Sequence, residues 1–97
     1  MRRFYRTLNK LSKLYSKHPV NVYFSTAKDM KEKYGDCNFT GKSFTIRIAK
    51  CDWHTMNLIL IHEFAHVLCW FDYLPEDDWH CDKWAVSYGV CWRAYSQ

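Results

Sequence analysis

The sequence predicts a small α+β domain in which helices pack against a mostly antiparallel three-stranded sheet. Three features support this fold class: amphipathic helical patterns at both ends of the chain, three short β-rich segments between residues 20 and 49, and a long, almost entirely apolar helical segment over 56–71. With 97 residues, the chain is near the lower end of the length that builds its own core. We therefore expect one domain, residues 1–97.

The segment from Arg2 to Lys17 is predicted to form an amphipathic helix. One stripe of this helix is apolar and consists of Phe4, Leu8, Leu11 and Tyr15. The helix is expected to end before Pro19, because a proline disfavours the helical conformation in the residue that precedes it. A basic amphipathic helix can lie on a membrane or a phosphate backbone, but packing of its apolar stripe on the domain is the favoured interpretation.

Residues 20–26 form the first predicted strand, because apolar and polar residues alternate there and β-branched and aromatic side chains are frequent. Thr26 and Asp29 then fit a capping box. This pattern predicts a short helix over 27–34, which Gly35 would end.

A β-hairpin is predicted next, with strands at residues 37–40 and 43–49. The two residues between them, Gly41 and Lys42, suit a type II′ turn, whose first central residue is glycine. Alternation in the second strand predicts three core-facing residues, which are Phe44, Ile46 and Ile48. We expect this second strand to be the outer one, along which an extended peptide can add by main-chain hydrogen bonds.

The helical segment 56–71 contains the motif His62-Glu63-Phe64-Ala65-His66. Histidines four residues apart on a helix stand one turn above each other on one face, where both can bind one zinc ion. Glu63 points to the side and can reach water at such a metal, so it suits a general base. Two histidines and a glutamate are costly in an apolar helix unless something satisfies them. The alternative is that they hydrogen-bond within the core or face a solvent cleft.

The boundaries of the last two helices are predicted from polar residues that can cap them. Asp52 or Thr55 can cap the motif-bearing helix, and Asp77 or Asp78 can cap a last helix over 79–95. An acidic, turn-rich connection joins the two helices, so we expect them to run antiparallel.

A catalytic zinc site needs three protein ligands and one open position. His80 is the predicted third ligand, because it lies in the first turn of the last helix, where an antiparallel return would bring it back to the metal. The alternative ligands are Glu76, Asp77, Cys81 and Asp82. Trp84, one turn beyond His80, is expected to pack against the motif-bearing helix.

These motifs resemble the SprT-like zincins, and most closely the small, minigluzincin-like zinc metallopeptidases of bacteriophages and bacteria. The matching segments are Tyr34-Gly35-Asp36-Cys37, the strand 44–48, His62 to Trp70, His80 to Trp84, and then Tyr88, Cys91 and Arg93. The resemblance implies an α+β zincin fold and a hydrolase that cleaves peptide bonds. It also implies a zinc ion held by the three histidines, with Glu63 as the catalytic base.

Two supporting roles stay open at this point. The oxyanion formed in peptide hydrolysis needs a second donor, for which Tyr88 and Tyr73 are candidates, although each equally suits core packing. The zinc histidines also need hydrogen-bond acceptors that fix their tautomers. The candidate acceptors are Asp82, Asp77 and Asp72.

The charge is distributed unevenly, with a net charge of +9 over residues 1–50 and −5 over residues 51–97. The basic half could contact nucleic acid or an acidic protein, although a solvated face is the favoured interpretation. The alternative function is therefore a non-catalytic, zinc-stabilised scaffold that binds a host protein or nucleic acid. The intact Glu63 favours a peptidase, since a scaffold needs no base.

The chain has five cysteines, no C-x-x-C pair and no signal peptide at Met1. This combination predicts reduced thiols in a cytoplasmic protein, or in the host cytoplasm if the protein is phage-encoded. The apolar run around Ile59 is too short to span a bilayer. We expect a monomer without membrane contact, whose partner is a protein or peptide substrate.

Overall fold

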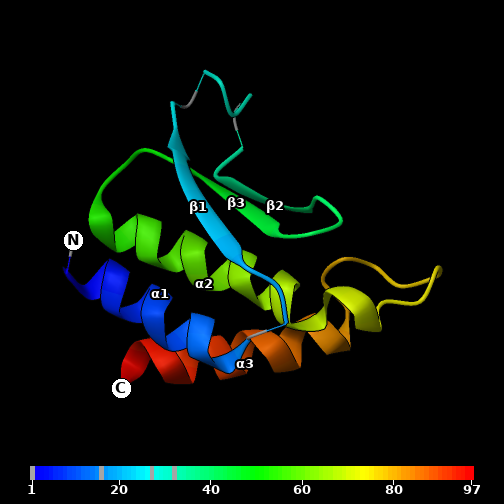
Figure 1. Cartoon of the computed structure of the whole chain (residues 1–97). Helices are drawn as coiled ribbons and strands as arrows, with labels where there is room; N and C mark the ends of the chain where they lie inside the picture. The colour runs from blue at the N-terminus through cyan, green and yellow to red at the C-terminus, as the bar shows by residue number, and fades with distance from the viewer. Residues whose placement is uncertain (1, 16, 27, 32) are drawn as a thin grey trace.

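The computed structural model describes residues 2–15, 17–26, 28–31 and 33–97, which form three α-helices and one three-stranded sheet (Figure 1). Helix α2 is the central element, because it packs against β2 and β3 on one side and against α1 and α3 on the other. In chain order the elements are α1 (Arg2–Leu14), β1 (Val20–Ser25), β2 (Gly35–Phe39), β3 (Phe44–Ala49), α2 (Trp53–Cys69), the 3₁₀ helix η1 (Trp70–Asp72) and α3 (Asp82–Ser96).

The sheet has the strand order β1-β3-β2, so β3 is its central strand. β3 pairs in parallel with β1, where Val20 lies opposite Phe44, and antiparallel with β2, where Gly35 lies opposite Ile48. The predicted hairpin is confirmed, and Gly41 in its turn has a φ of 94°, which favours glycine. The predicted α+β fold class is also confirmed, but the sheet is mixed rather than mostly antiparallel. The predicted outer strand is in fact the central one.

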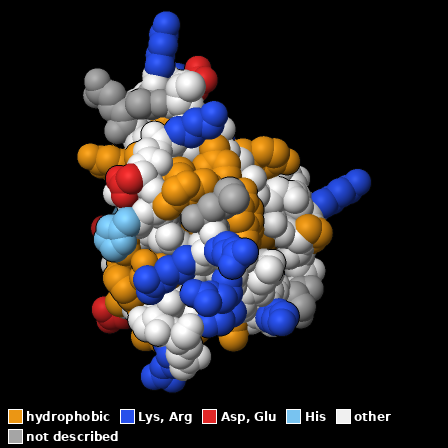
Figure 2. All heavy atoms as spheres, turned by 90° about the vertical axis from the view of Figure 1, so that its left-hand side faces the viewer, with side chains coloured by type: hydrophobic (Ala, Val, Ile, Leu, Met, Phe, Trp, Pro, Cys, Tyr) orange, Lys and Arg blue, Asp and Glu red, His pale blue; other side chains and the backbone are white. Residues whose placement is uncertain are grey.

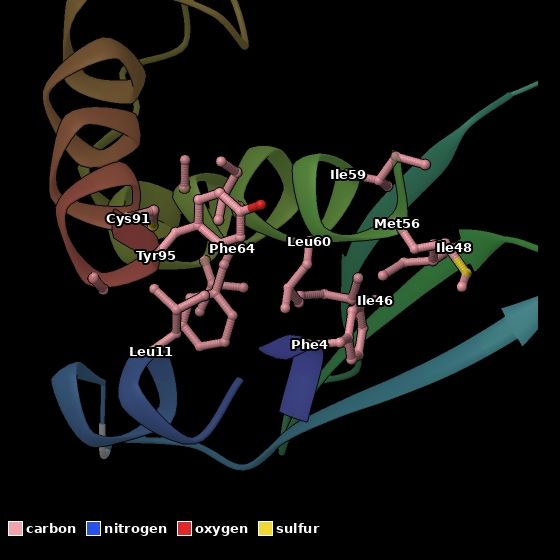
Figure 3. Packing of buried hydrophobic residues seen from close by; sticks show 14 of the residues in the cluster. Phe4, Leu11, Ile46, Ile48, Met56, Ile59, Leu60, Phe64, Cys91 and Tyr95 are labelled. Atoms are coloured by element: carbon pink, nitrogen blue, oxygen red, sulfur yellow. The ribbon is translucent and has the colours of Figure 1, made fainter. Parts of the chain in front are cut away.

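The hydrophobic core lies where α1, α2 and α3 meet the sheet (Figure 3). The three predicted core residues of β3, Phe44, Ile46 and Ile48, are fully buried. Phe4 and Leu11 of α1 are fully buried too, and the other two residues of the predicted apolar stripe are half-buried against the same core. The apolar stripe of α1 therefore packs on the domain, as its spacing predicts.

Helix α3 begins at Asp82, three residues later than predicted, and its N-cap is Cys81. The two aspartates that were expected to cap it are used in the preceding turn. Asp77 Oδ2 accepts a hydrogen bond from the backbone N–H of Leu74 at 2.7 Å, and Asp78 Oδ1 accepts one from the N–H of His80 at 2.8 Å. Because these bonds close the turn, the helix cannot start at residue 79.

The segment after β1 forms turns over residues 28–31, not the predicted short helix, while Ala27 and Glu32 of that prediction lie outside the described residues. The predicted capping pair does form, since Thr26 Oγ1 accepts from the N–H of Asp29 at 3.2 Å. Lys31 has a φ of 51°, which a continuing right-handed helix does not allow.

In the described part of the chain, no helix combines the length and the apolar character that a membrane crossing requires.

Candidate metal centre

Helix α2 supplies the first three side chains of the site. Its start is fixed by Asp52, whose side chain accepts a hydrogen bond from the N–H of Thr55 at 2.8 Å, which decides between the two predicted caps. The helix then runs without interruption past the motif, so His62 and His66 stand one turn apart, with ring centroids separated by 5.4 Å. Glu63 between them is buried.

His80 comes from the turn that precedes α3 and reaches back to α2. Its Nε2 lies 3.1 Å from Nε2 of His62, and its ring centroid lies 5.0 Å from that of His66. The prediction that His80 meets the two motif histidines agrees with this geometry. Its predicted place in the first turn of the helix is wrong, because His80 lies two residues before α3 and is held there by Asp78.

The three histidines are positioned to bind a metal ion. One ring nitrogen from each can be chosen so that all three lie within 4.8 Å of one another. Two nitrogen ligands of a tetrahedral zinc ion, each about 2.0–2.1 Å from it, stand about 3.3 Å apart, close to the observed spacing of His62 and His80. Among the described residues, no other group of three His, Cys, Asp or Glu side chains is arranged in this way, so the alternative ligands Glu76, Asp77, Cys81 and Asp82 are not part of the cluster.

The protonation of the histidines suits metal binding, which requires neutral imidazole. Burial, together with the neighbouring His62 and His80, lowers the pKa of His66 to about 4. Burial and the proximity of His80 likewise lower the pKa of His62. Both rings of α2 are therefore neutral near pH 7 and can offer a lone pair.

Glu63 lies beside the histidines, with its Oε2 3.9 Å from Nε2 of His62. Burial, and secondarily the charge of Asp36, raises the pKa of Glu63 to about 7. Asp36 itself is paired with Arg47 across the β2–β3 hairpin. Strand β2 passes directly over Glu63 at Gly35, where a side-chain Cβ would stand only 3.2 Å from the Glu63 carboxylate.

A cleft of about 350 Å³ opens onto the histidines and Glu63. Strand β2 forms one wall through residues 35–37, and the connection between α2 and α3 forms the other through Trp70, Trp79 and His80. Chemically, the cleft combines three histidine side chains positioned to bind a metal ion, a carboxylate and the edge of a β-strand. These are the parts that a metal-dependent hydrolysis of an extended chain requires.

Behind His66 lies a tyrosine for which the sequence left two roles open. The Tyr73 hydroxyl is 3.1 Å from Nδ1 of His66 and donates a hydrogen bond to the backbone carbonyl of Trp79 at 2.7 Å. The sequence-based candidates for this supporting position were Asp72, Asp77 and Asp82, all carboxylates. The signal that could have indicated Tyr73 is its spacing of seven residues, two helical turns, from His66, because η1 continues α2 almost to it.

Two aromatic residues of α3 cover the other side of the site. Trp84 donates its indole N–H to the backbone carbonyl of His62 at 3.3 Å, and its ring lies 4.9 Å from the His62 ring, as expected from its position. Tyr88 stacks on Trp84 and lies 6.3 Å from the His62 ring. Asp82, a predicted supporting residue, begins α3 instead.

Comparison with known proteins identifies the family. A model described as the SprT-like family matches residues 1–93, which includes α1 as well as the segments that carry the motifs. Searches of the curated proteins and of the solved structures give no match. Because the family model covers nearly the whole chain, the protein belongs to the SprT-like family.

Proposed function

We propose that this protein is a zinc-dependent metallopeptidase, built as one domain, in which Glu63 acts as the general base. The observation that carries the proposal is the grouping of His62, His66 and His80 with the Glu63 carboxylate at the floor of one cleft. Membership of the SprT-like family supports it. The non-catalytic scaffold is the weaker alternative, because a scaffold gains nothing from a buried carboxylate beside the metal-binding nitrogens.

The three histidines would hold the zinc ion, each through one ring nitrogen. When bound, zinc supplies Lewis acidity toward a substrate carbonyl and toward water. Three neutral nitrogen ligands leave a fourth position open, which is the arrangement of catalytic rather than structural zinc sites. Cys81, which directly follows His80 in the chain, is the N-cap of α3 and is not in the cluster, so it does not close that position.

Glu63 would transfer the proton of the reaction as a general base and then as a general acid. Its carboxylate lines the cleft beside His62, so it could accept the proton of the attacking water and later deliver it to the leaving amine. Tyr88 remains the candidate donor to the oxyanion. Tyr73 is less suited to that role because its hydroxyl proton is already given to the Trp79 carbonyl.

The substrate would bind along β2, the outer strand beside the cleft, and not along β3. The backbone N–H of Ala49 bonds to the carbonyl of Tyr34, and the N–H of Thr40 bonds to the carbonyl of Ser43. Because hydrogen-bonded and non-hydrogen-bonded pairs alternate in an antiparallel ladder, the residues of β2 with odd numbers point their backbone groups away from β3. An extended peptide can use these groups by adding as a fourth strand.

The test is the substitution Glu63→Gln, compared with the wild-type protein. Zinc per chain is measured by elemental mass spectrometry, and cleavage of a denatured protein mixture is followed by mass spectrometry of newly formed peptide N-termini. We expect about one zinc ion per chain in both proteins, and a loss of cleavage in the variant of at least the 10²-fold that general-base catalysis contributes. Undiminished cleavage by a zinc-loaded Glu63→Gln protein would contradict the assigned role.

A further inference from the structure

We propose that Tyr73 is a positioning residue of the metal centre: its hydroxyl fixes the tautomer of His66 and, through the same oxygen, anchors the segment that carries His80. The inference rests on the proposed metal site but concerns a residue outside the cleft. Tyr73 lies on the connection between α2 and α3, one residue after η1, and its hydroxyl contacts Nδ1 of His66.

The direction of the hydrogen bonds follows from which groups can donate. The backbone carbonyl of Trp79 can only accept, and it lies 2.7 Å from the Tyr73 oxygen, so the phenolic proton must point to it. The Tyr73 oxygen then has only lone pairs to offer to Nδ1 of His66 at 3.1 Å. Nδ1 must therefore carry the proton of the neutral ring and donate it to the tyrosine.

This assignment decides which nitrogen of His66 is available to a metal. A neutral imidazole carries one N–H, so a proton on Nδ1 leaves the lone pair on Nε2. His66 is buried, so solvent offers no equivalent partner for Nδ1. Histidine ligands in metal sites commonly donate their second N–H in this way, and loss of the partner typically weakens metal binding by 10–100-fold.

The second hydrogen bond of Tyr73 reaches the third histidine. Trp79 directly precedes His80, so the bond from Tyr73 to the Trp79 carbonyl fixes the backbone next to that side chain. The rings of Tyr73 and Trp79 also pack at 4.8 Å in an edge-to-face arrangement. One hydroxyl therefore joins the helix that holds His66 to the turn that holds His80, which lies outside any regular element and needs such support.

The chain contains a matched control for the substitution Tyr73→Phe. The Tyr15 hydroxyl lies 2.8 Å from Nδ1 of His18, a contact of the same type that involves none of the clustered histidines. The variants Tyr73→Phe and Tyr15→Phe each remove one hydroxyl from a Tyr–His contact and keep the ring. Zinc affinity of the full-length proteins is measured by competition with a chromophoric chelator.

We expect Tyr73→Phe to bind zinc 10–100-fold more weakly than wild type, and Tyr15→Phe to bind as wild type does. An unchanged affinity in Tyr73→Phe would overturn the proposal, because the phenyl ring keeps the packing and only the hydrogen bonds are lost. An equal loss in both variants would overturn it too, since the effect would then not depend on the site.

A measurement on the wild-type protein alone keeps the inference testable if Tyr73→Phe does not fold. Long-range ¹H–¹⁵N correlation spectra identify which ring nitrogen of His66 is protonated. We expect the proton on Nδ1, and a proton on Nε2 would overturn the proposal. The spectrum can be recorded with and without zinc. A wild-type protein that binds no zinc would contradict the proposed function, but the tautomer of its His66 would still decide the role of Tyr73.

Discussion

At Gly35 the sheet passes close to the carboxylate of Glu63. A Cβ at this position would stand 2.6 Å from Cγ2 of Ile59, 3.1 Å from the backbone oxygen of Arg47 and 3.2 Å from Oε2 of Glu63. The Ile59 side chain can move, but the Arg47 backbone oxygen belongs to the neighbouring strand and cannot shift without moving the sheet. The absence of a side chain therefore lets β2 form the wall of the cleft directly above Glu63.

The substitution Gly35→Ala tests this close approach. We expect it to lower the free energy of unfolding by about 1–3 kcal/mol, the usual cost of forcing extra volume into a packed site, and to reduce peptide cleavage by displacing Glu63. Gly89→Ala is the control, because nothing lies within 4 Å of its Cβ position. In the interior of α3, that change should stabilise the protein by about 0.8–1.0 kcal/mol. Chemical denaturation of both variants measures the difference, and equal stability of the two would contradict the steric argument.

At the scale of residues, the sequence indicated the three clustered histidines better than the residues that hydrogen-bond to them. The spacing of His62 and His66 depends only on the geometry of one helix, and His80 could be inferred because a short connection limits where the chain returns. The role of Tyr73 depends on where its oxygen lies relative to His66 and the Trp79 carbonyl. Such a three-way contact is set by tertiary packing, so no local pattern specifies it.

Among the elements, α2 connects the core to the metal centre. Its first turn is capped by Asp52, which bonds both the N–H and the hydroxyl of Thr55 at 2.8 Å. These hydrogen bonds hold the pKa of Asp52 below its ordinary value. Because the folded-state pKa is the lower one, the cap stabilises the fold at pH values above the unfolded-state pKa, and this contribution is lost as the pH falls through the folded-state value.

The substitution Asp52→Ala should therefore lower the midpoint of thermal unfolding by a few degrees near pH 7. The difference from wild type should begin to shrink as the pH falls below the unfolded-state aspartate pKa of about 3.9. It should be lost at the lower folded-state pKa, where the wild-type carboxylate becomes protonated. Thermal unfolding followed by circular dichroism over a series of pH values measures both effects. Glu76→Ala, which removes an exposed carboxylate from a turn, serves as the control and should show neither effect. A difference that persisted unchanged in acid would contradict the capping argument.

The elements also show where sequence patterns stop being informative. The β2–β3 hairpin was predictable because a two-residue turn with glycine first joins neighbouring segments. The parallel pairing of β1 with β3 was not predictable, because it joins strands that are not consecutive in the chain. The start of α3 was misplaced for a related reason: Asp77 and Asp78 have the chemistry of helix caps, but a tertiary turn uses them first.

Over the whole molecule, the basic residues of α1 line a groove that is separate from the cleft of the three histidines. Lys and Arg side chains gather on one face (Figure 2), and a shallow groove along α1 is lined by Arg2, Tyr5, Arg6, Asn9, Lys10 and Lys13. The opposite stripe of α1 carries Phe4 and Leu11 into the core. Helix α1 thus has a basic face and an apolar face, and mutation can separate their contributions to stability and to binding.

We expect that replacing Arg2, Arg6 and Lys13 together with glutamine will leave the unfolding midpoint and the zinc content nearly unchanged, because exposed charges contribute little to stability. Phe4→Ala in the same helix should cost about 3–5 kcal/mol, a large part of the stability of so small a domain. Thermal unfolding and elemental mass spectrometry measure both variants. Loss of zinc in the triple variant would contradict the separation of the two faces. Salt-dependent nucleic-acid binding by wild type that disappears in the triple variant would instead support the scaffold alternative, since phosphate contacts release counterions.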